Sequence, residues 1–161
     1  MTDFRTLIEA LCRGKVGFVI VGGVAATLHG SARLTQDVDV VYARDSQNLA
    51  RIATALAPLA PHLRGAPPGL PFALDEKTLA AGLNFTLTTT AGDIDLLGEI
   101  TGIGGYDAAA AHALRVNLFG YECLCLDLLT LVQAKTAAGR PKDLDAVAEL
   151  KTLLIERDRK N

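Results

Sequence analysis

The residues best suited to chemistry in this sequence are two aspartates, Asp37 and Asp39, separated by one valine. The run from Asp37 to Tyr42 alternates acidic and apolar residues and then becomes apolar, which predicts a β-strand. Side chains two positions apart project from the same face of a strand, so the two carboxylates lie side by side. Neighbouring carboxylates repel each other and are costly to bury, and a shared cation offsets that cost. Carboxylate oxygens suit a hard ion, so the pair predicts a Mg²⁺ site.

Two glycines, Gly22 and Gly23, precede these aspartates at the end of an apolar run. Glycine allows a tight turn from a strand into a helix and lets the backbone approach a phosphate group closely. A glycine turn required only for packing is the alternative, and the glycine pair alone favours it. Because the two aspartates follow, we interpret the glycine pair as a phosphate-binding turn.

A second acidic pair, Asp93 and Asp95, follows the turn Ala91-Gly92 and alternates with apolar residues in the same way. Strands are expected over 83–89 and 93–97, and they form a hairpin around that turn. Asp93 and Asp95 therefore share one face of a strand, and either could supply a third metal-binding carboxylate.

These segments resemble the signature of the nucleotidyltransferase superfamily, which includes DNA polymerase beta and kanamycin-type nucleotidyltransferases. The signature is an apolar residue, Gly, then Gly or Ser, a spacer, and Asp-apolar-Asp-apolar. Here Val21-Gly22-Gly23 is followed by the spacer Val24 to Gln36 and by Asp37-Val38-Asp39-Val40. The resemblance extends over roughly residues 16–150, so it is not confined to one motif.

The resemblance implies one α/β (α+β) domain over residues 1–161, with a mixed central β-sheet flanked by helices. It implies a Mg²⁺-dependent enzyme, with two ions bound and Mn²⁺ as an alternative, that transfers NMP from an NTP to an acceptor. Asp37, Asp39 and Asp95 are the implied catalytic and metal-binding carboxylates, with Asp95 as a ligand of the acceptor-side metal or as a base. Asp95 is preferred to Asp93 because the run from Asp95 to Glu99 is similar to that of small bacterial members.

The resemblance also implies four nucleotide-binding positions. Gly22, Gly23 and the helix that follows them receive the triphosphate. Lys135 lies in a run, Ala134 to Asp143, that is similar to the same bacterial members, and it is expected to reach the nucleotide phosphates. Arg33 precedes the aspartate strand and is either a phosphate ligand or a surface arginine.

Periodicity predicts the remaining elements. Strands are expected over 16–21, 114–119 and 121–126, and helices over 4–12, 46–59, 75–81, 106–113, 128–138 and from 141 onward. The buried stripe of the last helix is expected to comprise Leu144, Val147, Ala148, Leu150, Leu153 and Leu154. The charged tail 156–161 is expected to fray, and the proline-rich segment 61–71 is expected to be an irregular surface loop.

Composition narrows the function classes. Of the 161 residues, 50% are hydrophobic and 21% are charged, which excludes a disordered chain. A net charge of −2 gives no general attraction for nucleic acid or for an anionic membrane. Three cysteines without a metal-binding spacing, no signal-peptide pattern and no apolar run long enough for a membrane helix predict a cytoplasmic protein.

Two other enzyme classes fit poorly, and one alternative stays open. The nucleophile motif of haloacid-dehalogenase-type phosphatases needs an apolar strand leading into the first aspartate, but residues 31–36 are mostly polar. A Rossmann fold needs Gly-x-Gly-x-x-Gly, which the glycine pair lacks.

The open alternative is a non-catalytic or toxin–antitoxin or phage-defence subunit with this fold that binds a protein or RNA partner. If the protein is an enzyme, no motif identifies whether its acceptor is RNA, protein or a small molecule.

Overall fold

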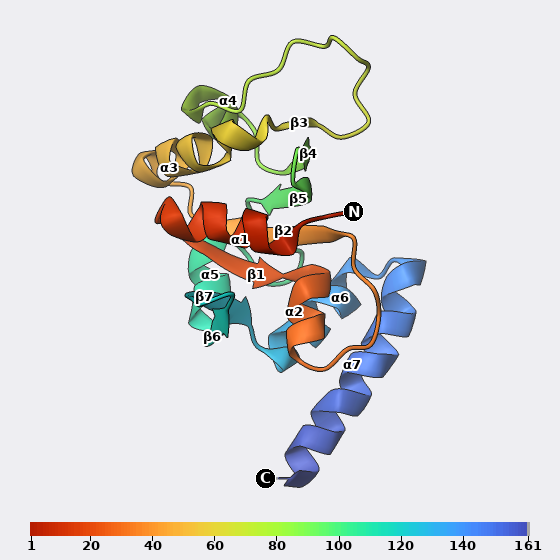
Figure 1. Cartoon of the computed structure of the whole chain (residues 1–161). Coiled ribbons are helices and arrows are strands. Elements are labelled where there is room, and N and C mark those ends of the chain that lie inside the picture. Colours follow the sequence, from red (N-terminus) through yellow and green to blue (C-terminus); the bar gives the residue numbers. More distant parts are fainter. Residues whose placement is uncertain (161) are drawn as a thin grey trace.

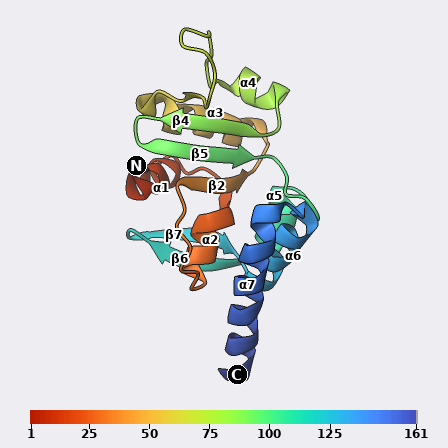
Figure 2. The same cartoon turned by 90° about the vertical axis from the view of Figure 1, so that its right-hand side faces the viewer.

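The computed structural model describes residues 1–160, and its strands form one mixed sheet of seven strands (Figures 1 and 2). The strands are β1 (Phe18–Val21), β2 (Asp37–Tyr42), β3 (His62–Leu63), β4 (Phe85–Thr89), β5 (Gly92–Leu97), β6 (Ala113–Leu118) and β7 (Tyr121–Leu126). Their order in the sheet is β3-β4-β5-β2-β1-β7-β6. Strand β2 lies at the centre, antiparallel to β1 and parallel to β5. The expected mixed central sheet is confirmed.

The helices lie near the predicted ranges, but the helix expected over 46–59 ends at Leu56, and the one expected over 106–113 ends at Ala111 because Ala113 begins β6. They are α1 (Phe4–Arg13), α2 (Gly22–Leu28), α3 (Ser46–Leu56), α4 (Glu76–Ala81), α5 (Tyr106–Ala111), α6 (Leu128–Ala138) and α7 (Pro141–Lys160), with a 3₁₀ turn at Ala57–Leu59. Four of them begin at an aspartate whose side chain accepts a hydrogen bond from a backbone N–H three residues later: Asp3, Asp45, Asp75 and Asp127. These caps satisfy donors that the first turn of a helix leaves without a partner.

The apolar side chains of β2 and β5 fix the direction of the acidic ones. Val38 and Val40 on β2, and Ile94 and Leu96 on β5, are fully buried. They belong to one hydrophobic core with the buried residues of α1, namely Leu7, Ile8 and Leu11. Because strand side chains alternate between faces, the aspartates that separate these residues point to the opposite face of the sheet.

The buried stripe of α7 differs from the expected one. Leu144 is 65% exposed and Ala148 is also exposed, whereas the buried residues are Asp143, Ala146, Val147 and Leu150. The polar residue in this stripe explains the difference, because Asp143 points inward and pairs with Lys135 on α6. A stripe deduced from apolar residues alone is therefore rotated relative to the real one.

The expected fraying of the tail is not found over residues 156–160, since α7 continues to Lys160; Asn161 lies outside the described residues. No glycine or proline follows Pro141, and the arginine, lysine and glutamate residues of this segment favour a helix. Among residues 1–160, no helix is both long and apolar enough to cross a membrane.

The segment 61–71 contains a short strand that the sequence does not indicate. Strand β3 pairs with β4 through His62, opposite Thr88, and Leu63, opposite Leu87. The chain then runs without helix or strand to α4, as a long connection that extends away from the sheet (Figure 1). This pairing brings Arg64, the first residue after β3, close to the acidic face of the sheet.

Candidate active site

Four aspartates form a two-by-two arrangement, here named the aspartate grid, on one face of strands β2 and β5. The strand register places Asp37 opposite Asp93 and Asp39 opposite Asp95. Carboxylate oxygens of Asp37, Asp39 and Asp95 all lie within 4.8 Å of one another. The three carboxylates expected from the sequence are thus brought together, and Asp93 lies outside this closest group.

The electrostatics of the grid are unfavourable without an additional positive charge. Burial, together with the charges of Asp37 and Asp95, raises the pKa of Asp39 to about 7. Burial and the charge of Asp95 also raise the pKa of Asp37, while Arg64 acts in the opposite direction. The Oδ1 atom of Asp39 is buried and has no hydrogen-bond partner. A buried carboxylate oxygen without a donor is a costly arrangement that a bound cation relieves.

The grid fits a hard divalent cation. Its three closest side chains offer only oxygen atoms, and Mg²⁺ in proteins is bound by carboxylates together with water and substrate phosphates. The partnerless Oδ1 of Asp39 is an available ligand atom among them. Asp37, Asp39 and Asp95 are therefore the residues that could hold Mg²⁺.

The turn from β1 into α2 lies directly beside the grid. Gly22 has φ +64°, and a Cβ atom at this position would overlap Asp39, approaching its Cβ to 2.9 Å. A Cβ atom on Gly23 would come within 2.7 Å of the Cβ of Thr35. Glycine at both positions therefore leaves space for the aspartate and keeps the wall of the site free of side chains.

A buried ion-pair network from α6 and α7 flanks the other side of the site. Asp143 is only 2% exposed, and it accepts hydrogen bonds from Nε of Arg140 at 2.8 Å and from the Arg140 backbone N–H at 3.2 Å. Nζ of Lys135 lies 3.9 Å from Oδ1 of Asp143. Lys135 also acts on Asp39, where its charge opposes the effect of burial on the pKa. Lys135 is thus paired with Asp143 and is near enough to Asp39 for its charge to lower the pKa of that carboxyl.

One cavity of about 660 Å³ connects these parts. Its walls include all seven residues that the sequence indicates as catalytic or nucleotide-binding: Gly22, Gly23, Arg33, Asp37, Asp39, Asp95 and Lys135. Arg33 is exposed at the edge of this cavity, and its backbone N–H donates to Oγ of Ser31 at 3.2 Å. The cavity has the size of a small-molecule site.

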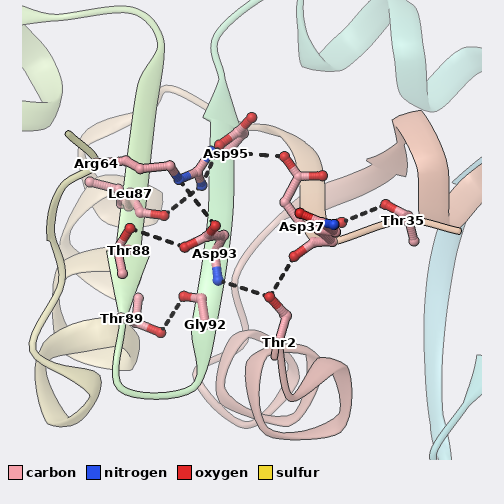
Figure 3. A network of polar contacts seen from close by, with 11 residues as sticks. Thr2, Thr35, Asp37, Arg64, Leu87, Thr88, Thr89, Gly92, Asp93 and Asp95 are labelled. Carbon is pink, nitrogen blue, oxygen red and sulfur yellow. Dashed lines mark hydrogen bonds and ion pairs between the residues drawn. The ribbon is translucent and has the colours of Figure 1, made fainter.

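Arg64 is the residue of the site that sequence reasoning misses. Its guanidinium lies 2.9 Å from Asp95 Oδ1, 3.4 Å from Asp93 Oδ2 and 3.9 Å from Asp37 Oδ2, reaching the grid across β4 and β5 (Figure 3). Its Nη2 also donates to the backbone oxygen of Leu87 at 2.7 Å. No local pattern marks this arginine, because its position depends on the pairing of the two-residue strand β3 with β4.

No sequence-family model and no curated protein matches the chain. Solved structures do. The lincosamide antibiotic adenylyltransferase LnuA, in its lincomycin-bound form, superposes over 94% of this chain and 98% of its own, with a TM-score of 0.60 at 14% sequence identity. A candidate nucleotidyltransferase from Thermotoga maritima superposes over 94% of this chain and 90% of its own, with a TM-score of 0.53 at 16% identity. The chain therefore has the fold of the nucleotidyltransferases, as its sequence motifs predict.

Proposed function

We propose that this chain is a Mg²⁺-dependent nucleotidyltransferase that transfers NMP from an NTP to an acceptor. One observation carries the proposal: Asp37, Asp39 and Asp95 converge to within 4.8 Å, beside a glycine turn, in a chain with this fold. The buried, partnerless Oδ1 of Asp39 supports it, because an idle carboxylate in that position only destabilises the protein.

The three aspartates hold the metal in this proposal. When bound, two Mg²⁺ ions stabilise the negative charge that develops on the transferred phosphoryl group and on the pyrophosphate that leaves. The acceptor oxygen forms a bond to the α-phosphorus while the bond from the α-phosphorus to the bridging oxygen of the β-phosphate breaks. The acceptor loses its proton to a carboxylate of the site, for which Asp95 is our candidate, or to solvent.

The remaining residues of the cavity bind the triphosphate. Gly22 and Gly23 present no side chain, so phosphate oxygens can approach the backbone there. Lys135 supplies a positive charge that Asp143 holds in place, and Arg33 supplies a second one at the edge of the cavity. Together they offset the charge of the nucleotide opposite the acidic grid.

The lincosamide adenylyltransferase favours one class of acceptor as the first to test. That protein acts on a small antibiotic, and its chain superposes almost completely on this one. A hydroxyl group on a small molecule is therefore the first candidate, ahead of RNA or protein. The net charge of −2 agrees with this order, because RNA-binding surfaces are usually basic.

The experiment combines binding and transfer. Purified protein is titrated with each NTP by calorimetry, with and without Mg²⁺, and is then incubated with α-labelled NTP and panels of small hydroxylated compounds, RNA and proteins. We expect Mg²⁺-dependent NTP binding and transfer of label, both abolished by Asp39→Ala. The same variant should stay folded in metal-free buffer, since it removes a carboxylate from a repulsive cluster.

A partner-binding role without catalysis is the second candidate. The ion pairs of Arg64 with Asp37, Asp93 and Asp95 favour it, because they partly neutralise the grid without any metal. A toxin–antitoxin or phage-defence subunit in the cytoplasm would fit such a chain. Absence of Mg²⁺-dependent NTP binding in the titration would select this role.

A further inference from the structure

Arg64 supplies all three ion pairs that the described residues form with the aspartate grid. The closest joins its Nη2 to Oδ1 of Asp95 at 2.9 Å, at the upper end of the range for charge-assisted hydrogen bonds. The guanidinium is therefore a counter-ion of the grid, contributed by the chain itself.

Two of the carboxylates that Arg64 contacts are also the expected ligands of a divalent cation. Asp95 and Asp37, which Arg64 contacts at 2.9 and 3.9 Å, also belong to the group of three that fits Mg²⁺. A divalent ion and a guanidinium that share carboxylates repel each other, so each weakens the binding of the other. Asp93 lies outside the metal-binding group and pairs with Arg64 at 3.4 Å, so this partner is free of the competition.

The chain around Arg64 is suited to movement. The Nε atom is buried and makes no hydrogen bond, and its ion pair with Oδ2 of Asp93 is long, at 3.4 Å, so the guanidinium is held only loosely at this atom. Gly65 follows at φ +77° with no atom within 4 Å of the position of a Cβ, and residues 64–75 form neither helix nor strand. The backbone N–H of Arg64 itself donates to the oxygen of Thr86 at 3.0 Å, so the backbone stays attached to β4 while the side chain and the loop after it can shift.

We propose that Arg64 holds the grid together in the metal-free protein and releases Asp95 and Asp37 when a divalent cation binds there, keeping its contacts with Asp93 and with the backbone oxygen of Leu87. The inference rests on the proposed metal-dependent function and adds a positioning residue to it. Metal loading then has two consequences: the carboxylates change partners, and the loop that begins at Arg64 is loosened.

The first test measures Mg²⁺ and Mn²⁺ binding, without nucleotide, to the wild type and to two variants. Arg64→Gln removes the competing charge and should bind the ions more tightly, by about tenfold, while its metal-free form melts at a lower temperature. Arg64→Lys keeps the charge and should stay close to the wild type. Arg51→Gln, at an exposed position on α3, is the matched control and should change neither property. Equal or weaker metal binding by Arg64→Gln overturns the proposal.

The second test needs no variant of Arg64 and therefore does not depend on the folding of one. Trypsin cleaves after arginine faster when fewer contacts hold the side chain away from its specificity pocket, and the Arg64–Gly65 bond lies at the start of a loop in which Gly65 is exposed. Adding Mg²⁺ to the full-length protein should accelerate cleavage at this bond, as followed by mass spectrometry. Asp39→Ala should show no Mg²⁺ effect. Unchanged or slower cleavage of the wild type with Mg²⁺ contradicts the release of Arg64.

The outcomes separate this inference from the function on which it rests. If the wild type binds Mg²⁺ but neither the affinity of Arg64→Gln nor the cleavage responds, only the counter-ion role fails. If neither the wild type nor Arg64→Gln binds a divalent ion, both proposals fail. If Arg64→Gln binds a divalent ion and the wild type does not, the result supports the competition between Arg64 and the ion directly.

Discussion

Asp39 on β2 lies directly opposite Asp95 on β5, in a parallel pairing that also places Asp37 opposite Asp93. The pairing places the aspartates of both segments on the same face of the sheet, although the two segments are more than fifty residues apart in the sequence. It does not make the four carboxylates equivalent, because Asp95 joins Asp37 and Asp39 in the group that fits a metal, whereas Asp93 lies outside that group and accepts a hydrogen bond from Oγ1 of Thr88.

This difference predicts which carboxylate catalysis requires. Asp95→Asn should lower kcat/KM for nucleotidyl transfer by more than about 100-fold, beyond the loss typical of residues that only support metal ligands. Asp93→Asn, its matched control on the same strand, should cost no more than about 10–100-fold, since Asp93 acts through Arg64 and Thr88. Steady-state kinetics on both variants checks this, and equal losses would contradict the assignment of Asp95.

The glycine turn gives a prediction about stability. Gly22→Ala and Gly120→Ala both place a Cβ at positive φ, +64° and +87°, which costs about 1–2 kcal/mol. Only Gly22→Ala also forces a Cβ into Asp39, whereas Gly120 has no atom within 4 Å of that position. Urea unfolding should therefore show a larger loss for Gly22→Ala, and calorimetry should show weakened Mg²⁺ binding for that variant alone. The same loss in both variants would mean that Asp39 moves aside without cost.

Lys135 should act on nucleotide affinity. Lys135→Ala should weaken Mg²⁺-NTP binding by about tenfold or more, as expected for the loss of one charged contact to phosphate. Asp143 keeps its hydrogen bonds to Arg140 in this variant, so the fold should persist. Isothermal titration against Lys151→Ala, an exposed position on α7, checks this. An unchanged affinity would remove Lys135 from the nucleotide site.

The thiol of Cys125 predicts a dependence of stability on pH. Burial raises its pKa from 9.0 to about 11, with a further contribution from the charge of Asp127. Because the folded state binds the proton more tightly than the unfolded state, this stabilisation is complete below pH 9 and is lost as the pH rises towards 11. By pH 10 the contribution of this thiol to the unfolding free energy should have fallen by about 1.4 kcal/mol.

Denaturant unfolding at pH 7.5 and pH 10 tests the thiol prediction. Cys125→Ala should show a smaller decrease between the two pH values than the wild type. Val132→Ala truncates another buried side chain without removing an ionisable group, and it should follow the wild type. A decrease for Cys125→Ala as large as that of the wild type would contradict the raised pKa.

Much of the fold and of the acidic grid follows from local sequence patterns. The alternation of aspartate with valine gives the bounds of β2, and the same alternation gives the direction of Asp95 on β5. The break at Gly139-Arg140-Pro141 separates the last two helices. Such features depend on residues within a few positions of each other, so they can be predicted from the sequence without knowing which distant segments are in contact.

The parts that the sequence does not reveal depend on contacts between distant segments. Arg64 reaches the grid only because β3 adds to the edge of β4, and two residues between prolines and glycines give no strand pattern. Asp143 is buried because Arg140 and Lys135 neutralise it, which reverses the usual expectation that an aspartate on a helix faces water. Leu144 is exposed as a result of the same rotation.

The regular alternation of the aspartates with Val38, Val40, Ile94 and Leu96 also affects how the protein folds. If β5 paired with β2 after a slip of one residue, Asp93 and Asp95 would enter the apolar layer against α1, and the isoleucine and leucine would face water. Unpaired carboxylates in that layer are too costly for such a sheet to persist. The charges that the proposed chemistry needs thus disfavour any other register of β5 on β2. A chain in which these two strands have paired therefore also has its four aspartates in place.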